Sequence, residues 1–231
     1  MRARVAGRSL FKRGFYWFSK TLLKYALTAY VGTRYFNVPD LRKMEGGLLI
    51  ASNHQSFLDP VLVGMSFSRP ISYMARRSLF RIPGLGLFLR LVGVHPIRRG
   101  EVDSSALRLI LKLLRGGETL LMFPEGTRTP DGELGEFKAG VVSLALRTRV
   151  PILPVCVEGA FESWPRSRVL PRPSRVVIAY GELIVPGDEK PEQLNERIRK
   201  EVGKLQADLR RALGRPQGRL LDVASGEAGG V

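Results

Sequence analysis

The stretch Thr119-Leu-Leu-Met-Phe-Pro-Glu-Gly-Thr-Arg128 decides the fold of this chain. Its first five residues form an apolar run, which predicts a buried β-strand. Pro124 ends that strand, because proline has no N–H to donate to a sheet ladder. Gly126 then lets the backbone turn close to a ligand. The pattern predicts a buried strand leading into a polar loop, at the edge of the sheet where α/β proteins place their sites.

Two charged side chains, Glu125 and Arg128, are left at this edge of the predicted sheet. An arginine beside open backbone N–H groups is a good receptor for phosphate. A simple Pro-Gly turn carrying a solvated ion pair would have the same sequence. The loop alone therefore leaves a phosphate site and an ordinary turn both open.

Strands and helices alternate along the chain on either side of this loop. Such alternation predicts an α/β fold with a mixed, largely parallel sheet flanked by helices on both faces. Besides 119–123, the predicted strands are 48–51, 71–75, 93–97, 150–155 and 175–180. The predicted helices of this domain are 61–67, 85–92, one that Asp103 caps, 141–147 and 191–213.

Three regions follow from this pattern. Residues 1–45 form a basic and aromatic N-terminal segment, which we predict to be helical and to bind membranes. Residues 46–213 form the predicted α/β domain. Residues 214–231 are rich in glycine and poor in apolar residues, so we predict a disordered tail.

Residues 10–30 have the periodicity of one amphipathic helix. Arg13, Lys20 and Lys24 lie opposite the apolar stripe, and an aromatic face with a basic face suits a helix in a membrane interface. A helix that packs on the core with a solvated back is the alternative. Lys24 and Arg34 interrupt any apolar stretch long enough to span a bilayer. The stripe consists of Phe11, Phe15, Phe18, Leu22, Tyr25, Ala26 and Ala29.

Charge and composition narrow the function classes. The 231 residues carry a net charge of +16, which favours anionic partners such as acidic lipid, phosphate esters, an acidic carrier protein or nucleic acid. Residues 1–43 hold ten Lys and Arg against one Asp, more than half of the net charge. A single cysteine, Cys156, excludes an internal disulfide and fits a reducing compartment. Two histidines and one cysteine are too few for a His/Cys metal site.

His54 and Asp59 are the candidate catalytic pair. Five residues apart on one straight helix they would point about 140° away from each other, so they meet only across a turn. The run Ser52-Asn-His-Gln-Ser56 supplies such a turn after a strand. Asp59 could then hold His54 in one tautomer and support the imidazolium. The alternative is that Asp59 caps the helix at Pro60 and His54 is an ordinary loop residue.

Four blocks in order resemble the lysophosphatidic acid acyltransferase family of glycerolipid acyltransferases. The resemblance covers about residues 46–185. Its blocks are His54-Gln-Ser-Phe-Leu-Asp59, Gly93-Val-His-Pro-Ile-Arg-Arg99, Phe123-Pro-Glu-Gly-Thr-Arg128 and Val150-Pro-Ile-Leu-Pro-Val155. The second block departs from the family, because Arg98 stands where the family often has Asp. Arg99 is therefore the better counterpart of the arginine that ends this block in the family. Ala75-Arg-Arg-Ser-Leu79 replaces an Ala-Lys-x-Glu-Leu segment, so a lysine role would pass to Arg76, which is not equivalent to lysine, and the glutamate role is absent.

The resemblance implies acyl transfer from a thioester to the free hydroxyl of a lysophosphatidate. His54 would act as the general base and Asp59 would orient it. Arg99 and Arg128 would hold the acceptor phosphate, with Lys138 as an outer ligand. The backbone near Gly126 is one candidate oxyanion donor. The remaining implied binding residues are Glu125, Gly126 and Thr127, although Thr127 is also a common turn residue.

The implied partners are lysophosphatidic acid, anionic membrane lipid and a donor that is acyl-CoA or acyl-carrier protein. We expect no separate cofactor, and a monotopic or peripheral place on the cytoplasmic face of the cell membrane. Glycerol-3-phosphate, a lyso-ornithine lipid or another lysophospholipid remains open as the acceptor. A basic nucleic-acid-binding protein is the alternative from another class, but no recognised nucleic-acid motif is present, so we expect no nucleic-acid partner.

Overall fold

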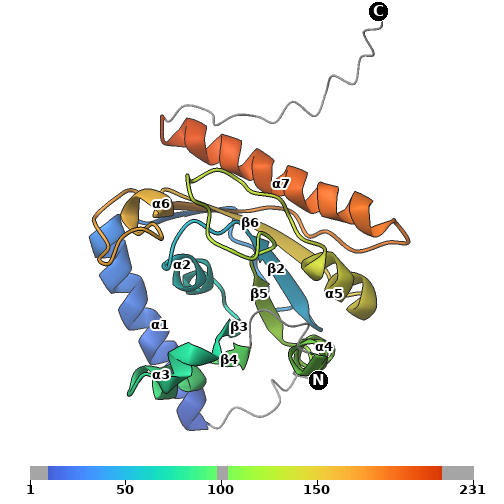
Figure 1. Ribbon diagram of the computed structural model, residues 1–231, viewed down its shortest axis with the longest axis horizontal. Helices are drawn as coiled ribbons and strands as arrows, with labels where there is room; N and C mark the ends of the chain where they lie inside the picture. The colour runs from blue at the N-terminus through green and yellow to red at the C-terminus, as the bar shows by residue number, and fades with distance from the viewer. Residues whose placement is uncertain (1–9, 98–103, 215–231) are drawn as a thin grey trace, which may run out of the picture.

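The computed structural model describes residues 10–97 and 104–214, and its centre is a seven-stranded sheet (Figure 1). The strand order is β1-β7-β6-β2-β5-β3-β4. All neighbouring strands are parallel except β6 and β7, which are antiparallel. The strands are β1 (Arg34–Phe36), β2 (Leu48–Ser52), β3 (Ile71–Arg76), β4 (Val94–Ile97), β5 (Thr119–Met122), β6 (Ile152–Glu158) and β7 (Val177–Tyr180). The predicted mixed, largely parallel sheet is confirmed.

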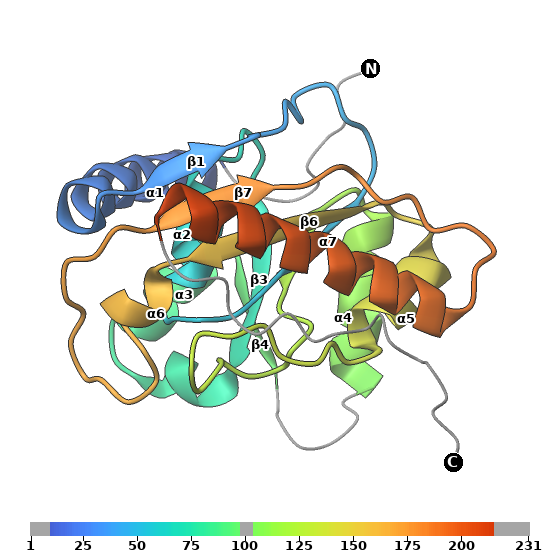
Figure 2. The same cartoon turned by 90° about the horizontal axis from the view of Figure 1, so that it is seen from above.

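Helices cover both faces of this sheet, as the alternation of the sequence predicts (Figures 1 and 2). In order they are α1 (Leu10–Val31), α2 (Asp59–Met65), the 3-10 helix η1 (Arg77–Arg81), α3 (Leu85–Leu91), α4 (Ser104–Arg115), α5 (Gly140–Thr148), α6 (Ala160–Ser163) and α7 (Pro191–Ala212). The cap predicted at Asp103 lies outside the described residues, and so does the tail from residue 215.

The sheet separates two hydrophobic clusters. Along β2, Leu49 and Ala51 face the cluster formed with α4, α5 and α7, while Leu48 and Ile50 face the cluster formed with α2 and the end of α1. All four side chains are fully buried. A strand covered on both faces is apolar along its whole length, which explains the continuous apolar runs in the sequence.

Two features of the sheet were not predicted. β1 adds an edge strand that pairs in parallel with β7, so residues 34–36 of the N-terminal segment belong to the same sheet as the α/β domain. Three residues are too few to show a period of two. β6 continues three residues beyond the predicted end at Val155, to Glu158, which places a buried carboxylate at the end of that strand.

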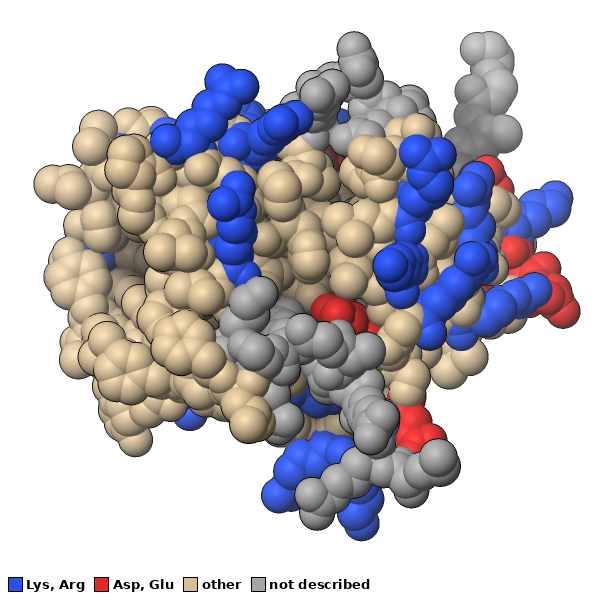
Figure 3. Space-filling model, turned by 90° about the horizontal axis from the view of Figure 1, so that it is seen from below, with Lys and Arg blue, Asp and Glu red and all other residues tan. Residues whose placement is uncertain are grey.

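α1 leaves most of its predicted apolar stripe in solvent. Phe11, Phe18, Leu22 and Tyr25 are 59–72% exposed, whereas Phe15 is half-buried and lies edge-on to Phe88 of α3. The helix instead rests on α2 and α3 through another face, and the buried Tyr16 accepts a hydrogen bond from the N–H of Ile71. The stripe is therefore not a core face. In the view of Figure 3, the side on which α1 and α3 lie carries few charged groups.

The polar face of α1 differs from the prediction at Lys20. Its amine donates to the carbonyl of Phe67, just beyond α2, and lies 4.6 Å from the ring centre of Trp17. Burial lowers the pKa of Lys20 to about 8. Lys20 therefore joins α1 to the end of α2 rather than facing solvent. Lys24 is exposed, and the side chain of Arg13 lies outside the described part.

Among the helices within residues 10–97 and 104–214, none has the length and hydropathy needed to cross a membrane.

Candidate active site

The candidate site lies where two neighbouring strands, β2 and β5, reach their carboxyl ends. β2 leads into residues 53–58 and then α2, and β5 leads into residues 123–129. Because the two strands are parallel and in register from Leu48 and Thr119 onward, their following loops leave the sheet at one edge. The strand order thus brings together two blocks that lie about 70 residues apart in the sequence.

His54 and Asp59 meet across the predicted turn. Nδ1 of His54 lies 2.8 Å from Oδ2 of Asp59, whose side chain is completely buried. The same oxygen accepts the backbone N–H groups of Gln55 and Ser56, each at 2.7 Å. Asp59 is the first residue of α2, after Leu58 at the N-cap, and no side chain caps the helix, so the carboxylate pairs with His54 instead of acting as the predicted alternative cap. The three hydrogen bonds fix both the carboxylate and the imidazole ring.

The imidazole is held from a second side by an aromatic ring. The rings of His54 and Phe123 are stacked, with 3.9 Å between their centroids and 15° between their planes. The carbonyl of His54 also accepts the N–H of Thr129 at 2.8 Å. With Nδ1 turned toward Asp59, Nε2 is the ring nitrogen left for a reacting group. Phe123 was read from the sequence only as the end of a strand.

Glu125 joins the two blocks. Its Oε1 accepts the backbone N–H of His54 at 3.0 Å, and the N–H of Gly135 also donates to this carboxyl. The side chain is buried, with 6% exposed, and burial raises its pKa to about 7. A Cβ atom at Gly135 would lie 3.1 Å from Oε2, so the glycine permits the close approach of this segment. Glu125 therefore positions the histidine loop as well as the loop that follows β5.

Gly126 forms the turn that the sequence predicts. Its φ is +71°, in the left-handed region that favours glycine. Its N–H donates to the carbonyl of Phe123 at 3.0 Å, so this N–H is engaged, while an oxyanion donor elsewhere in the backbone near Gly126 stays a prediction. An added Cβ would lie 3.2 Å from Nζ of Lys138, which places that exposed amine against the loop. Thr127 is exposed beside it.

Arg128 lies over an aromatic ring. Its guanidinium carbon is 3.4 Å from the ring centre of Phe57, a residue of the first block that the sequence analysis did not single out. Phe57 in turn contacts Trp164, with 5.2 Å between ring centroids. A cation over a ring face is attracted by the ring quadrupole. The stack places the charge of Arg128 on the same side of the sheet as His54.

Arg99, the other predicted phosphate ligand, lies outside the described residues, as does Arg98. The strand before them, β4, ends at Ile97 beside Arg76 of β3. Since β3 and β4 run parallel to β5, their carboxyl ends belong to the edge of the sheet that carries the other site residues. Arg76 and Arg77 are exposed there.

A buried polar network behind the histidine loop was not predicted. Nε2 of Gln55 donates to the carbonyl of Gly132 at 2.9 Å and to Glu158 at 3.2 Å. Gln206 and Arg210 of α7 donate to the same carbonyl, and Arg210 also pairs with Glu158 at 3.4 Å. Burial raises the pKa of Glu158. The network ties α7 to both site loops, and only the tertiary structure brings its members together.

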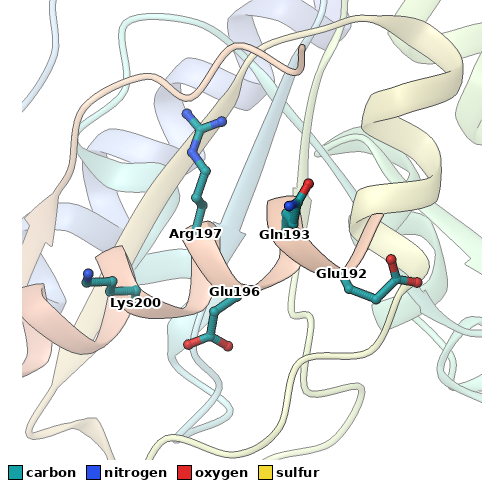
Figure 4. Close-up of a pocket in the computed structure, with 5 residues that line it drawn as sticks. All are labelled: Glu192, Gln193, Glu196, Arg197 and Lys200. Carbon is teal, nitrogen blue, oxygen red and sulfur yellow. The ribbon is translucent and has the colours of Figure 1, made fainter. Parts of the chain in front are cut away.

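The described residues were also compared with what a metal site or a thiol nucleophile would need. Within the described residues, no group of three or more His, Cys, Asp or Glu side chains could hold a metal ion. Cys156 is completely buried, and burial raises the pKa of its thiol well above the usual value, which makes it a poor nucleophile. The hollow shown in Figure 4 is lined by α7 alone and by none of the site residues; it is formed by Glu192, Gln193, Glu196, Arg197 and Lys200.

The arrangement places an imidazole, oriented by a buried carboxylate, close to cationic groups. His54 can accept a proton at Nε2, and the negative charge of Asp59 stabilises the imidazolium that results. Arg128 and Lys138 supply positive charge nearby for an anionic group. Such a site suits a reaction in which a hydroxyl of an anionic substrate is deprotonated as it attacks.

Comparisons with known proteins agree with this chemistry. The model of the Acyltransferase family matches residues 32–158, more than half of the chain. The 1-acyl-sn-glycerol-3-phosphate acyltransferase of Bacillus subtilis is 30% identical over 145 residues, covering 62% of this chain and 71% of the relative. The crystal structure of the 1-acyl-sn-glycerophosphate (LPA) acyltransferase PlsC from Thermotoga maritima matches with a TM-score of 0.71 and 27% identity, covering 90% of this chain and 84% of that one.

Plant relatives are longer than the matched region. The chloroplastic 1-acyl-sn-glycerol-3-phosphate acyltransferase BAT2 of Brassica napus is 32% identical over 136 residues, which cover 58% of this chain and 38% of the relative. The corresponding protein LPAT1 of Arabidopsis thaliana is also 32% identical, and the match covers 36% of its length. The chain therefore spans less than half of these two relatives.

Proposed function

The chain belongs to the Acyltransferase family, and from this membership we propose that it makes phosphatidic acid. It moves a fatty acyl chain from a thioester, acyl-CoA or acyl-carrier protein, to the free hydroxyl of 1-acyl-sn-glycerol-3-phosphate. The observation that carries the proposal is the 2.8 Å contact between Nδ1 of His54 and the buried Asp59, beside Glu125 and Arg128. The names of the bacterial and plant relatives support the choice of acceptor.

The proposed reaction is a direct transfer. The acceptor oxygen attacks the thioester carbonyl while Nε2 of His54 takes the hydroxyl proton. The tetrahedral intermediate then collapses, the carbon–sulfur bond breaks, and the proton passes from His54 to the leaving thiolate. Asp59 holds Nδ1 of His54 and stabilises the transient imidazolium. General base catalysis of this kind contributes roughly 10²–10⁴-fold to the rate.

The acceptor phosphate is assigned to the basic groups at the same edge of the sheet. Arg128 is held over the ring of Phe57, with 3.4 Å between its guanidinium carbon and the ring centre, so its N–H groups are positioned before the substrate arrives. A planar guanidinium can bind two phosphate oxygens at once. Lys138, against Gly126, and Arg99, through the resemblance of its block, complete the proposed receptor. Glu125 holds the loop that carries Arg128 next to His54.

We place the protein at the cytoplasmic face of the cell membrane as a monotopic or peripheral protein. The exposed apolar stripe of α1 supports this location, because the transfer of side chains such as Phe18 and Leu22 out of water is favourable. The lipid acceptor and product reside in the bilayer, whereas the head group of the donor is soluble. An enzyme at the interface reaches both.

The test is an acyl-transfer assay on the purified full chain. Wild type is given acyl-CoA or acyl-carrier protein with lysophosphatidate, glycerol-3-phosphate, a lyso-ornithine lipid or another lysophospholipid, and thiol release and lipid product are both measured. His54→Ala should lower kcat by at least 10²-fold. The matched control is His95→Gln, at the second histidine of the chain, which lies in β4 and takes no part in the proposed reaction.

Three results would change the proposal. Near-normal kcat in His54→Ala would refute the base. Faster transfer to another acceptor would reassign the substrate but keep the reaction. Tight, salt-sensitive binding to duplex DNA without any transfer would favour the nucleic-acid-binding alternative.

A further inference from the structure

We propose that the loop of residues 165–172 is a second membrane contact, which places Val169 and Leu170 in the head-group region of an anionic bilayer beside α1. The inference deepens the proposed interfacial location and rests on it. It concerns a segment to which neither the site chemistry nor the pattern of α1 gives a role.

Val169 and Leu170 are unusually exposed for aliphatic side chains. Val169 is 87% exposed and Leu170 is 75% exposed. Two adjacent aliphatic groups in water contribute almost nothing to the stability of the fold, since they bury little apolar area. Transfer of these side chains from water into an apolar environment would be favourable. Adjacent exposed apolar groups flanked by polar ones are a common sign of an interaction surface.

Hydrogen bonds hold the loop in a defined shape, so Val169 and Leu170 have fixed positions at its exposed tip. The N–H of Arg172 donates to the carbonyl of Ser163 at 2.9 Å, and the hydroxyl of Ser163 donates back to the carbonyl of Arg172 at 2.8 Å. The indole N–H of Trp164 donates to the carbonyl of Arg168 at 3.2 Å. These bonds close the base of the loop below its apolar tip. A loop that is already ordered loses less entropy when it binds.

The charge around the tip favours an anionic surface. Residues 164–175 contain four arginines and no acidic residue: Arg166, Arg168, Arg172 and Arg175. All four are exposed. Apolar side chains that insert and basic side chains that stay at head-group level are the pattern of an interfacial anchor. A neutral protein surface would offer these arginines no groups of opposite charge.

The loop is continuous with the exposed side of α1. The hydroxyl of Tyr30, near the end of α1, donates to the carbonyl of Pro171 at 3.0 Å. Figures 1 and 2 both show the loop after α6 reaching the same side of the molecule as α1. Along α1, Phe18, Leu22 and Tyr25 are 66%, 59% and 72% exposed. Two separate contacts on one side define a plane for the bilayer better than a single helix, which could roll about its axis.

The base of the loop also touches the candidate active site. The carbonyl of Trp164 accepts the hydroxyl of Ser56 at 2.9 Å, and the ring of Trp164 contacts Phe57, on which Arg128 lies. A bilayer bound at Val169 is therefore one short loop away from the groups assigned to the acceptor phosphate. The contact would orient the site toward the surface from which a lipid acceptor arrives.

The first experiment compares vesicle binding of the full chain and of Val169→Ser with Leu170→Ser. Vesicles contain either phosphatidylcholine alone or phosphatidylcholine with phosphatidylglycerol. The double variant should bind the anionic vesicles roughly tenfold more weakly, because two aliphatic side chains no longer leave water. The matched control is Leu183→Ser with Val185→Ser, an exposed aliphatic pair flanking Ile184, and it should bind like wild type. Ile184 pairs with Ile152 at the start of β6, whereas the loop of residues 165–172 follows the end of that strand.

A second measurement reports insertion directly. Leu170→Cys carries an environment-sensitive dye; the native Cys156 is fully buried and does not compete for labelling. The emission should shift to the blue and gain intensity with anionic vesicles, whereas a dye at Val185→Cys should not respond. This readout does not depend on any enzymatic activity.

Two results would overturn the inference. One is an unresponsive dye at residue 170 together with vesicle binding by the double variant equal to that of the control pair. The other is wild-type vesicle binding with a selective loss of turnover with acyl-carrier protein, which would make the loop a docking site for that acidic donor. If wild type transfers acyl chains to no lysolipid while the dye still reports insertion, the proposed function fails and the membrane contact stands.

Discussion

Replacing Glu125 by Gln should remove a pH dependence of stability that burial of this carboxyl creates. The pKa of Glu125 rises from 4.5 to about 7 on folding, mainly because the side chain is only 6% exposed. A difference of this size corresponds to about 3 kcal/mol between the two protonation states. The direction of the effect follows from the burial.

The sign follows from which state binds more protons. Below about pH 4.5 the carboxyl is neutral in both the folded and unfolded chain, so its burial costs little. As the pH rises toward about 7, the unfolded chain loses this proton before the folded chain does, and the free energy of unfolding falls. Above about pH 7 the loss is complete, at about 3 kcal/mol. Glu125→Gln cannot ionise and loses nothing over this range.

The assay is urea unfolding of wild type and Glu125→Gln at about pH 4.5 and about pH 8. Glutamine keeps one acceptor for the N–H of His54 or Gly135, so the variant loses about 1 kcal/mol from a missing hydrogen bond at both pH values. That constant cancels when the change with pH is compared. Wild type should lose about 2–3 kcal/mol more than the variant on going to high pH. Glu196→Gln, an exposed residue of α7, controls for the change in net charge. Equal pH profiles for wild type and Glu125→Gln would refute the reasoning from burial.

Three further predictions concern the site and the membrane face. Asp59→Asn should lower kcat roughly 10²-fold while KM changes little, since the charge that supports the imidazolium is lost but the base remains. Steady-state kinetics measures both constants, and a change confined to KM would contradict this prediction. Arg128→Ala should raise KM for the acceptor roughly 10- to 100-fold and leave KM for the donor nearly unchanged, and equal effects on both would assign Arg128 to another role. Phe18→Glu with Leu22→Glu, both exposed in α1, should weaken binding to anionic vesicles at least tenfold without changing turnover of a short, soluble acceptor, and unchanged sedimentation with vesicles would argue against the interfacial helix.

Local patterns in the sequence were sufficient to predict the main strands and helices and most of the candidate site residues. The apolar run before Pro124 gives β5, and the i, i+3, i+4 spacing gives α7, because each depends on the chain within one turn or one strand. The turn between His54 and Asp59 follows from the polar run after β2. Arg128 was predicted from its motif and Lys138 from the family resemblance; Arg128 lies over Phe57, and Lys138 lies against Gly126 of the loop that carries Glu125.

Some roles depend on side-chain direction, which a pattern of residue types does not contain. The stripe of α1 includes Phe15, yet this ring turns toward Phe88, and Lys20 turns toward the end of α2. Likewise, nothing in the order of residues shows that Phe123 lies flat on His54 or that Phe57 lies under Arg128. Each contact is decided by the packing of a neighbouring element.

The sequence by itself determined the α/β class, the position of each long element and the choice of His54 and Asp59 as a candidate pair, which the structure brings into contact. Only the tertiary structure decided that β5 lies next to β2, that β1 joins the sheet, and that Gln55 and Gln206 of α7 donate to the same carboxylate of Glu158. The physical reason is the range of the interactions involved. Periodicity, proline and glycine act over a few residues, whereas strand order and buried hydrogen bonds depend on how distant segments fill the space on both faces of one sheet.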